Sequence, residues 1–547
     1  MTIIDTHAAG IDTNAADASP EAPVLAGDPT ASVGGWMTTT DHKRIGRMFI
    51  SVSLVGLLGV IVVAALLGIE RVDAEASMLD VNSIPQLFAM YRIGLTFVVL
   101  VPLLLGVAIA VVPLQLGARS LTFPRLAAAG FWTWFVGAVL VVISIACNGG
   151  PAGGNSKFVA LFLVSHITLL IGLVAGAGSL ATTILTARAP GMNMRRVPVF
   201  AWSALIGAVG MLLVLPAVMG ALIYTYVDYQ NGRFAFGGNL SINQWIGFGF
   251  TQPATIVYAV VAFGFSVEVI AVASGRKLPK RGVIFTGIGL VGIVAALGAM
   301  LQEPALLIGG VRDLGFRHGF AELLSYGFFN LLPVLGGFIV ISLGALALRS
   351  SNKTRVMAPV VFGLLGALMV FTGVAANAVY LVGDAHLTGT VFEEGVWLYI
   401  VYGGVLTALG AITYWGPKLW GRTIPDKAAL PLAGLGFIAT VLAALPLLIA
   451  GFAKQPAGVT EFDYSGPQNL WNLLSAAGHV LMFVTVLGFA ALAIRSFRKG
   501  SLAGDDPWDG QTLEWATSSP APYDNFVDMH TVASAEPLLD LKPRRDR

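Results

Sequence analysis

The sequence predicts an all-α integral membrane protein with a bundle of twelve transmembrane helices, and three observations predict this fold class. Of the 547 residues, 56% are hydrophobic and only 11% are charged, with a mean hydropathy of +0.79. Soluble proteins carry about 25% charged residues, so this composition excludes a soluble globular protein. The apolar residues also gather in runs of about 20, the length that a helix needs to cross a bilayer. The third observation is that Lys and Arg alternate in number between successive loops.

Twelve apolar segments divide the chain into three regions. Residues 1–40 are rich in Ala, Asp, Thr and Pro and lack the basic start and apolar core of a signal peptide, so we expect a disordered cytoplasmic arm. Residues 41–499 form the membrane domain, and residues 500–547 form a polar cytoplasmic tail. The twelve predicted spans are 48–70, 87–115, 127–147, 157–187, 198–226, 248–273, 282–309, 321–349, 357–383, 396–417, 430–453 and 470–494.

The loop charges predict the orientation of these spans. With an inner N-terminus, the seven inner segments hold 21 Lys and Arg residues, whereas the six outer loops hold six. Cytoplasmic loops carry the excess of Lys and Arg, so both termini are predicted to be cytoplasmic. The basic residues form no single patch, which gives no sign of nucleic acid binding. Cys147 is the one cysteine, which excludes an intrachain disulfide or a cysteine metal cluster.

Seven short strings along the chain point to a family. In chain order they are TTDHKRIG (39–46), VVPLQLGA (111–118), FPRL (123–126), RAPGM (188–192), SVEVIA (266–271), YWGPKLWGR (414–422) and LWNLLSAAG (470–478). With these strings the sequence resembles cytochrome c oxidase subunit I of the heme–copper oxidase family, from about residue 36 to 526. The tail string PWDGQTLEW (507–515) is similar to the tails of bacterial members. The resemblance implies a bacterial cytoplasmic membrane and partner subunits that resemble oxidase subunits II and III.

The same resemblance implies two hemes and a copper ion, held by histidines on spans two, six, seven and ten. Aligned on the quoted strings, none of the six ligand positions is a histidine in this chain. They are Tyr91, Gln252, Leu301, Gln302, Val396 and Leu398. Heme iron needs an axial donor such as His, Met, Cys or Tyr, and copper in such a site needs imidazoles. We therefore expect no heme, no metal and no catalytic residue, with heme and copper bound only if their ligands have moved.

The proton-transfer residues that the family implies are also missing. The span-six glutamate and the cross-linked tyrosine fall on Ala254 and Ile256. Three positions of the main proton channel fall on Ser120, Ala127 and Ile109. These losses accompany the loss of the metal ligands, so oxygen reduction by this subunit is not expected.

Five polar residues remain as candidates inside the predicted spans: Arg92, Glu303, Glu268, His166 and His479. Arg92 follows Tyr91 and lies one to two turns into the membrane from the outer side. We hypothesise that Arg92 reaches into the vacated heme region and pairs with Glu303 of span seven, because buried charges need partners. The alternative is that Arg92 extends to the outer interface along its aliphatic stem. Glu268 and His479 are expected to be structural.

These observations favour a cofactor-free subunit I homologue that acts as a non-catalytic subunit or scaffold of a respiratory-type complex. Two alternatives stay open. One is a working terminal oxidase whose heme ligands have moved, with His166 and His479 as the candidate ligands. The other is a channel or transporter that uses the emptied cofactor cavity, which needs a continuous polar path through the bundle.

Overall fold

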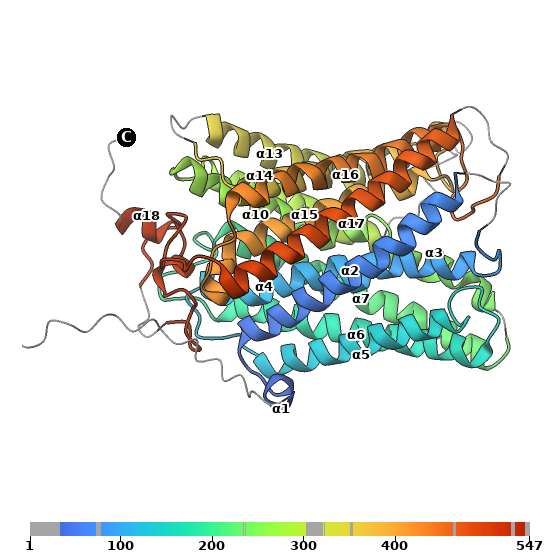
Figure 1. Ribbon diagram of the computed structural model, residues 1–547, viewed down its shortest axis with the longest axis horizontal. Coiled ribbons are helices and arrows are strands. Elements are labelled where there is room, and N and C mark those ends of the chain that lie inside the picture. Colours follow the sequence, from blue (N-terminus) through green and yellow to red (C-terminus); the bar gives the residue numbers. More distant parts are fainter. Residues whose placement is uncertain are drawn as a thin grey trace, which may run out of the picture.

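The structure is a computed structural model that describes residues 33–72, 78–233, 235, 237–301, 321, 323–349, 354–462, 467–526 and 531–541. Within these ranges it is a bundle of long helices and contains no β-strand (Figure 1). Twelve helices or helix series are long and apolar enough to cross a membrane, which confirms the predicted number of spans. Of the predicted arm, residues 33–37 form a short helix, α1 (Val33–Met37).

The spans follow the predicted segments in order. They are α2 (His42–Glu70), α3 (Ile84–Ile93) with η1 (Gly94–Leu100) and α4 (Val101–Gln115), α5 (Pro124–Ala146), α6 (Ser156–Thr186), α7 (Val199–Gln230), α9 (Ala254–Ala259) with α10 (Val261–Ser274), α11 (Arg281–Leu301), η5 (Gly327–Leu331) with α13 (Leu332–Arg349), α14 (Ala358–Tyr380), α15 (Phe392–Trp420), α16 (Asp426–Phe452) and α17 (Gln468–Lys499). Several helices extend past the apolar limits, since backbone hydrogen bonding continues into the polar ends. The short elements outside the spans include α8 (Ile242–Ile246), η7 (Leu513–Ala516) and α18 (Pro537–Leu541).

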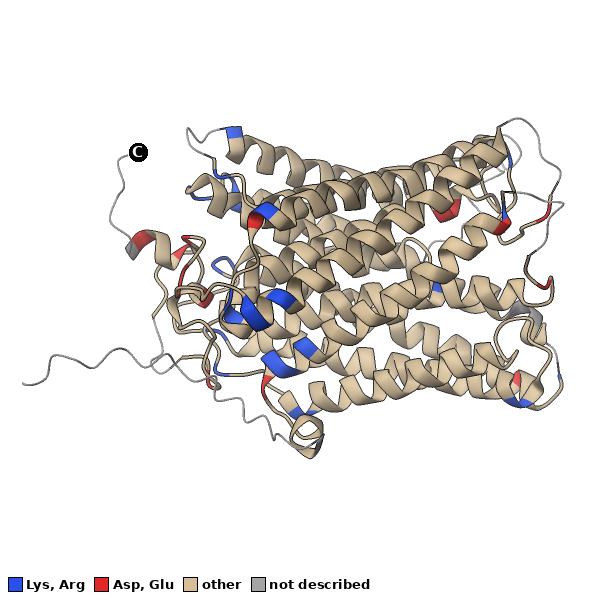
Figure 2. Ribbon diagram, viewed as in Figure 1, with Lys and Arg blue, Asp and Glu red and all other residues tan. Residues whose placement is uncertain are grey.

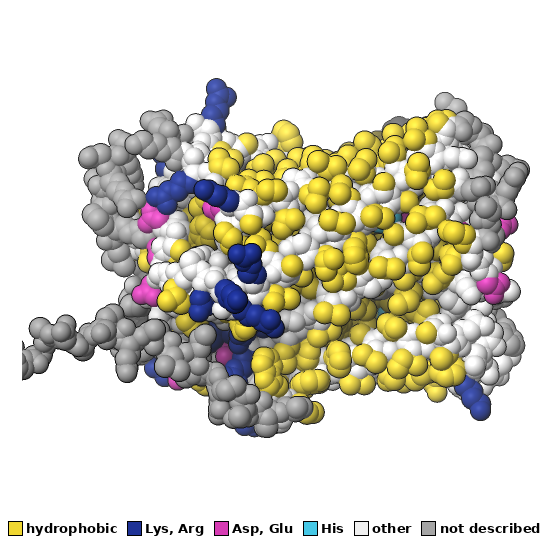
Figure 3. Space-filling model, viewed as in Figure 1, with side chains coloured by type: hydrophobic (Ala, Val, Ile, Leu, Met, Phe, Trp, Pro, Cys, Tyr) yellow, Lys and Arg dark blue, Asp and Glu magenta, His cyan; other side chains and the backbone are white. Residues whose placement is uncertain are grey.

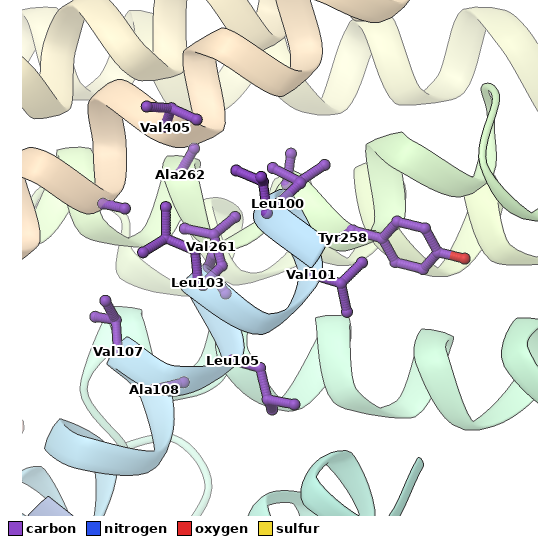
Figure 4. Close-up of a cluster of buried hydrophobic side chains, with 14 of the residues drawn as sticks. Leu100, Val101, Leu103, Leu105, Val107, Ala108, Tyr258, Val261, Ala262 and Val405 are labelled. Carbon is purple, nitrogen blue, oxygen red and sulfur yellow. The ribbon is translucent and has the colours of Figure 1, made fainter. Parts of the chain in front are cut away.

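Spans two, six and ten form the centre of the bundle. The most apolar stretch of each is wholly buried, whereas the other spans each leave part of theirs on the surface. A helix that is hydrophobic on all sides belongs in such a core. Figure 4 shows apolar side chains of η1, α4, α9, α10 and α15 packed against one another there. The surface of the surrounding helices is apolar over most of its length, as lipid contact requires (Figure 3).

Both described ends of the chain lie at one end of the bundle, which we call the terminus end; the other is the far end (Figure 1). Lys and Arg gather at the terminus end (Figure 2). The polar tail packs back on the bundle there. Asn525 Nδ2 donates to the Ala118 carbonyl at 2.7 Å, and Lys43 Nζ donates to Asn525 Oδ1 at 2.9 Å. Trp508 Nε1 donates to the Tyr414 carbonyl at 2.8 Å.

Glycines allow α14 and α15 to approach closely. A Cβ atom built on Gly403 of α15 would lie 2.8 Å from the Gly366 carbonyl oxygen and 2.8 Å from the Val370 nitrogen. Both neighbours are backbone atoms, which cannot move aside without shifting a helix. Small residues at such crossings let membrane helices pack by van der Waals contact.

We predict that Gly403→Ala lowers the free energy of unfolding by about 1–3 kcal/mol, the usual cost of overpacking a tight contact. The measurement is the melting temperature of the detergent-solubilised protein. Gly434→Ala in α16 is the matched control, because a Cβ there meets no atom within 4 Å. Equal melting temperatures for the two variants would show that the crossing has room for a methyl group.

Candidate functional site

Spans two and ten touch directly at the positions where the resemblance implies heme ligands. Tyr91 of α3 is buried, and its ring meets the Trp397 ring of α15 edge-on, with centroids 5.1 Å apart. Trp397 Nε1 donates to Thr96 Oγ1 at 3.2 Å, which ties α15 to η1. The neighbouring positions Val396 and Leu398 are fully buried. The space beside Tyr91 is therefore occupied by a protein side chain.

A buried ion pair lies beside this contact. Arg71 follows the last residue of α2, and Glu394 lies in the first turn of α15. Their charged groups meet in a two-point contact, with Arg71 Nη1 3.1 Å from Glu394 Oε1 and Nη2 2.8 Å from Oε2. Both side chains are almost fully buried. The Arg71 guanidinium also lies 4.8 Å from the centre of the Phe88 ring.

Two more side chains complete this group. His479 of α17 lies with Nδ1 2.7 Å from the Tyr402 hydroxyl of α15. The His479 ring also meets the Tyr91 ring edge-on at 5.9 Å. The Tyr91 hydroxyl faces Glu394, but no hydrogen bond of ordinary geometry joins it to a described residue. We call Arg71, Glu394, Tyr91, Tyr402 and His479 the far-end cluster; it joins α2, α3, α15 and α17.

The cation in this region is Arg71. It directly follows the predicted span 48–70, so the sequence places it in an outer loop. Arg92 is half-buried and makes no ion pair within the described chain. Its candidate partner Glu303 lies outside the described residues, as does Gln302, so the proposed pairing stays a prediction. Hydropathy gave no signal for Arg71, because a cation just past an apolar run is typical of a loop.

Two of the positions implied for copper, Gln252 and Leu301, lie in the described chain, as do the two span-six positions implied for the glutamate and the tyrosine. Gln252 is buried beside α9, and both polar atoms of its side chain lack a hydrogen-bond partner. Ala254 and Ile256 on α9 are buried and offer no donor. Leu301 lies at the described end of α11, where 68% of it is exposed. No group of three or more His, Cys, Asp or Glu residues in the described chain could hold a metal ion.

His166 of α6 is the one candidate histidine with a free imidazole. Its side chain is fully buried, and neither ring nitrogen has a hydrogen-bond partner. The rings of Phe97 and Phe162 meet it edge-on at 5.4 and 5.6 Å. A buried polar group without a partner is costly, so His166 is chemically unusual here. Glu268 lies at the terminus end, hydrogen-bonded to Gln115 and to the Phe200 backbone.

The described residues at the implied positions do not fit two hemes and a copper ion. Val396 and Leu398 offer no lone pair, and the Tyr91 ring is packed against Trp397. At the bundle centre, a Cβ on Gly404 would collide with the Leu100 side chain. A cavity bordered by Leu104, Met211 and Tyr258 has an accessible volume of about 10 Å³, room for at most one water molecule.

The chain is similar to known membrane proteins of one family. The sequence profile of the family described as Cytochrome C and Quinol oxidase polypeptide I matches residues 44–489. Cytochrome c oxidase subunit 1 of Bacillus subtilis is 28% identical over 525 residues, which cover 92% of this chain and 82% of that protein. The putative cytochrome c oxidase subunit 1-beta of Streptomyces avermitilis is 29% identical, with 97% and 96% covered.

A solved structure also shares the fold. It is a heme–copper terminal oxidase dimer determined by cryo-electron microscopy, which superposes with a TM-score of 0.64 at 12% identity. The superposition covers 91% of this chain and 88% of that one. The twelve-helix arrangement of this chain is therefore a known fold.

We predict that Glu394→Gln destabilises the protein by about 3–5 kcal/mol, because it removes the charge of Glu394 from the buried two-point contact with Arg71. Glu393→Gln, next along α15 but only half-buried, is the matched control and should cost far less. The double variant Arg71→Met/Glu394→Leu should recover most of the loss, since no charge is then buried. Equal melting temperatures for Glu394→Gln and Glu393→Gln would contradict the role of the pair.

Proposed function

This chain belongs to the Cytochrome C and Quinol oxidase polypeptide I family, and we propose that it is a non-catalytic, cofactor-free member. In this role it keeps the twelve-helix bundle and supports partner proteins in a respiratory-type membrane complex. One observation carries the proposal. The direct contact of Tyr91 with Trp397 occupies the space next to the ligand positions of spans two and ten.

The far-end cluster supports the same proposal. A heme held between two spans would cross-link them, and a chain without heme needs another link. The Arg71–Glu394 pair and the Tyr402–His479 hydrogen bond supply links among α2, α15 and α17.

The membrane setting follows from charge and from relatives. Bacterial oxidase subunits match nearly the full chain, which supports a bacterial cytoplasmic membrane. The gathering of Lys and Arg at the terminus end supports a cytoplasmic location for both termini (Figure 2). We propose partners that resemble oxidase subunits II and III, because subunit I proteins work within such complexes.

One observation favours a second candidate, a terminal oxidase with a moved heme ligand. His166 is a buried imidazole with both ring nitrogens free, and imidazole is the usual protein ligand of heme iron. His479 is a weaker candidate, since Tyr402 already engages its Nδ1. A channel finds less support, because the bundle centre in Figure 4 is packed with apolar side chains.

We predict that the pure protein contains no stoichiometric heme or copper. The measurements are a reduced-minus-oxidised absorbance spectrum and elemental analysis of protein expressed with heme supply in excess. A heme band that disappears in His166→Ala but survives in His479→Ala would instead establish the second candidate. A heme band that survives both substitutions would reject the cofactor-free proposal and point to a ligand elsewhere.

We also predict the orientation of the spans. A reporter fused at Lys280, in the α10–α11 loop, should report the cytoplasm, and one at Asn155, before α6, should report the outside. The expected result follows from the excess of Lys and Arg at the terminus end. The reverse pattern would overturn the assignment.

A further inference from the structure

Two carboxyl side chains meet inside the protein at the terminus end. Glu268 belongs to α10 of span six, and Glu514 belongs to η7 of the tail. Gln115, the last residue of α4, lies between them. All three side chains are buried. We call Glu268 and Glu514 the carboxyl pair.

The hydrogen bonds fix both carboxyl groups around one nitrogen. Gln115 Nε2 donates to Glu268 Oε1 and to Glu514 Oε1, the latter at 3.2 Å. The Phe200 backbone N–H donates to Glu268 Oε2 at 2.9 Å. Trp415 Nε1 donates to Glu514 Oε1 at 3.2 Å. Two acceptors that share one donor nitrogen lie within about 6 Å of each other, twice a hydrogen-bond distance.

One carboxylate oxygen of the pair has no hydrogen-bond partner. Glu514 Oε2 is buried and unpaired, and the buried Thr512 hydroxyl, which faces Glu514, also lacks a partner. Gln115 reaches the carboxyl pair through its Nε2, which donates to both carboxyl groups. Glu514 Oε2 is therefore an oxygen that can carry a proton.

No cation neutralises the pair. No Lys or Arg of the described chain lies within the 4 Å ion-pair distance of either carboxylate. Arg281 of α11 faces Glu268 but is engaged by Glu536, with Nη1 2.9 Å from Oε1. Lys418 of α15 faces Glu514 but donates to the carbonyls of Asp505 at 2.7 Å and Thr517 at 2.6 Å.

The remaining titratable group that faces the pair is Tyr414 of α15, whose hydroxyl accepts a hydrogen bond from Trp515 Nε1 at 3.1 Å. A neutral tyrosine adds no positive charge. Two carboxyl groups in one buried site cannot both ionise at low cost, because their negative charges repel each other. One of the two groups therefore keeps a proton. Burial raises the pKa of Glu514 above its usual range, in agreement with this geometry.

We propose that the carboxyl pair binds one proton at neutral pH, and that this proton fastens η7 of the tail to α4, α10 and α15. The proton comes from solvent at the terminus end and forms one O–H bond with a carboxylate oxygen. A cavity bordered by Glu268, Arg281, Thr512 and Glu536 has an accessible volume of about 20 Å³, which is room for one water molecule. Water there gives the bound proton a path for exchange.

The test is infrared spectroscopy of the full chain in lipid nanodiscs, which detects the carbonyl stretch of a protonated carboxyl group and its shift in D₂O. We expect such a band at neutral pH. In Glu268→Gln and in Glu514→Gln the band should disappear at a lower pH than in the wild type, because the remaining carboxyl group, although still buried, ionises without a like charge beside it. The double variant should lack the band. Asp540→Asn of α18 is the control and should leave the band unchanged, since the Asp540 carboxylate lies on the surface beside Lys277 and stays ionised.

Three results would overturn the proposal. One is a wild-type spectrum without a protonated carboxyl band, and another is a band that persists in the double variant. The third is a melting temperature that rises in sodium or potassium chloride but not in choline chloride. That result would show that the carboxyl pair binds a metal cation in place of a proton. If the variants fail to fold, the wild-type band, followed from neutral to alkaline pH, decides.

Hydrogen exchange of residues 511–516 gives an independent readout of tail attachment. A carboxyl group whose pKa is raised on folding contributes stability that is complete below its unfolded pKa and is lost as pH rises through its folded pKa. After correction for intrinsic rates, protection should therefore decrease toward alkaline pH in the wild type. In Glu514→Gln, which cannot ionise, protection should depend far less on pH; an equal pH dependence would contradict the proposal.

Discussion

The far end of the bundle depends on the Arg71–Glu394 ion pair. Two charges buried in a low-dielectric interior are stable only with good geometry and further hydrogen bonds. The two-point contact supplies the geometry, and Asn472 Nδ2, which donates to the Arg71 carbonyl at 3.1 Å, holds the end of α2 in place. Because Glu394 lies in the first turn of α15, the pair also fixes the position of the start of this central span. Tyr91, Trp397 and His479 then pack against a helix whose position is fixed.

The centre of the bundle has a different physical basis. Few polar side chains lie between spans two, six and ten at the centre, so these helices pack by the complementary shapes of apolar side chains. Gly404 lets Leu100 approach α15, and Gly403 lets α14 approach its other side. In the cofactor-free role that we propose, this apolar packing takes the place of a cofactor.

The sequence was sufficient for the fold and for part of the site. Apolar runs predict twelve spans because hydrocarbon contact constrains every residue of a span, and seven strings predict the family. The Arg71–Glu394 pair could not be predicted, because 323 positions separate its members and no local pattern joins them. Hydropathy assigned Arg71 to a loop, and it assigned residues 500–547 to a polar tail without showing that Glu514 and Trp515 are buried in the fold. Gln302 and Glu303 lie outside the described residues, so their role stays a prediction.

The two ends of the bundle solve the same electrostatic problem in opposite ways. At the far end, a buried carboxylate has a guanidinium partner, and its charge is cancelled by a side chain that cannot lose its proton. At the terminus end, Glu268 and Glu514 share a neutral amide, while the nearby cations Arg281 and Lys418 are engaged elsewhere. A side-chain partner makes a permanent link, whereas a proton makes one that solvent can remove. The first suits a joint between spans that must persist, and the second suits the attachment of a tail at an aqueous surface.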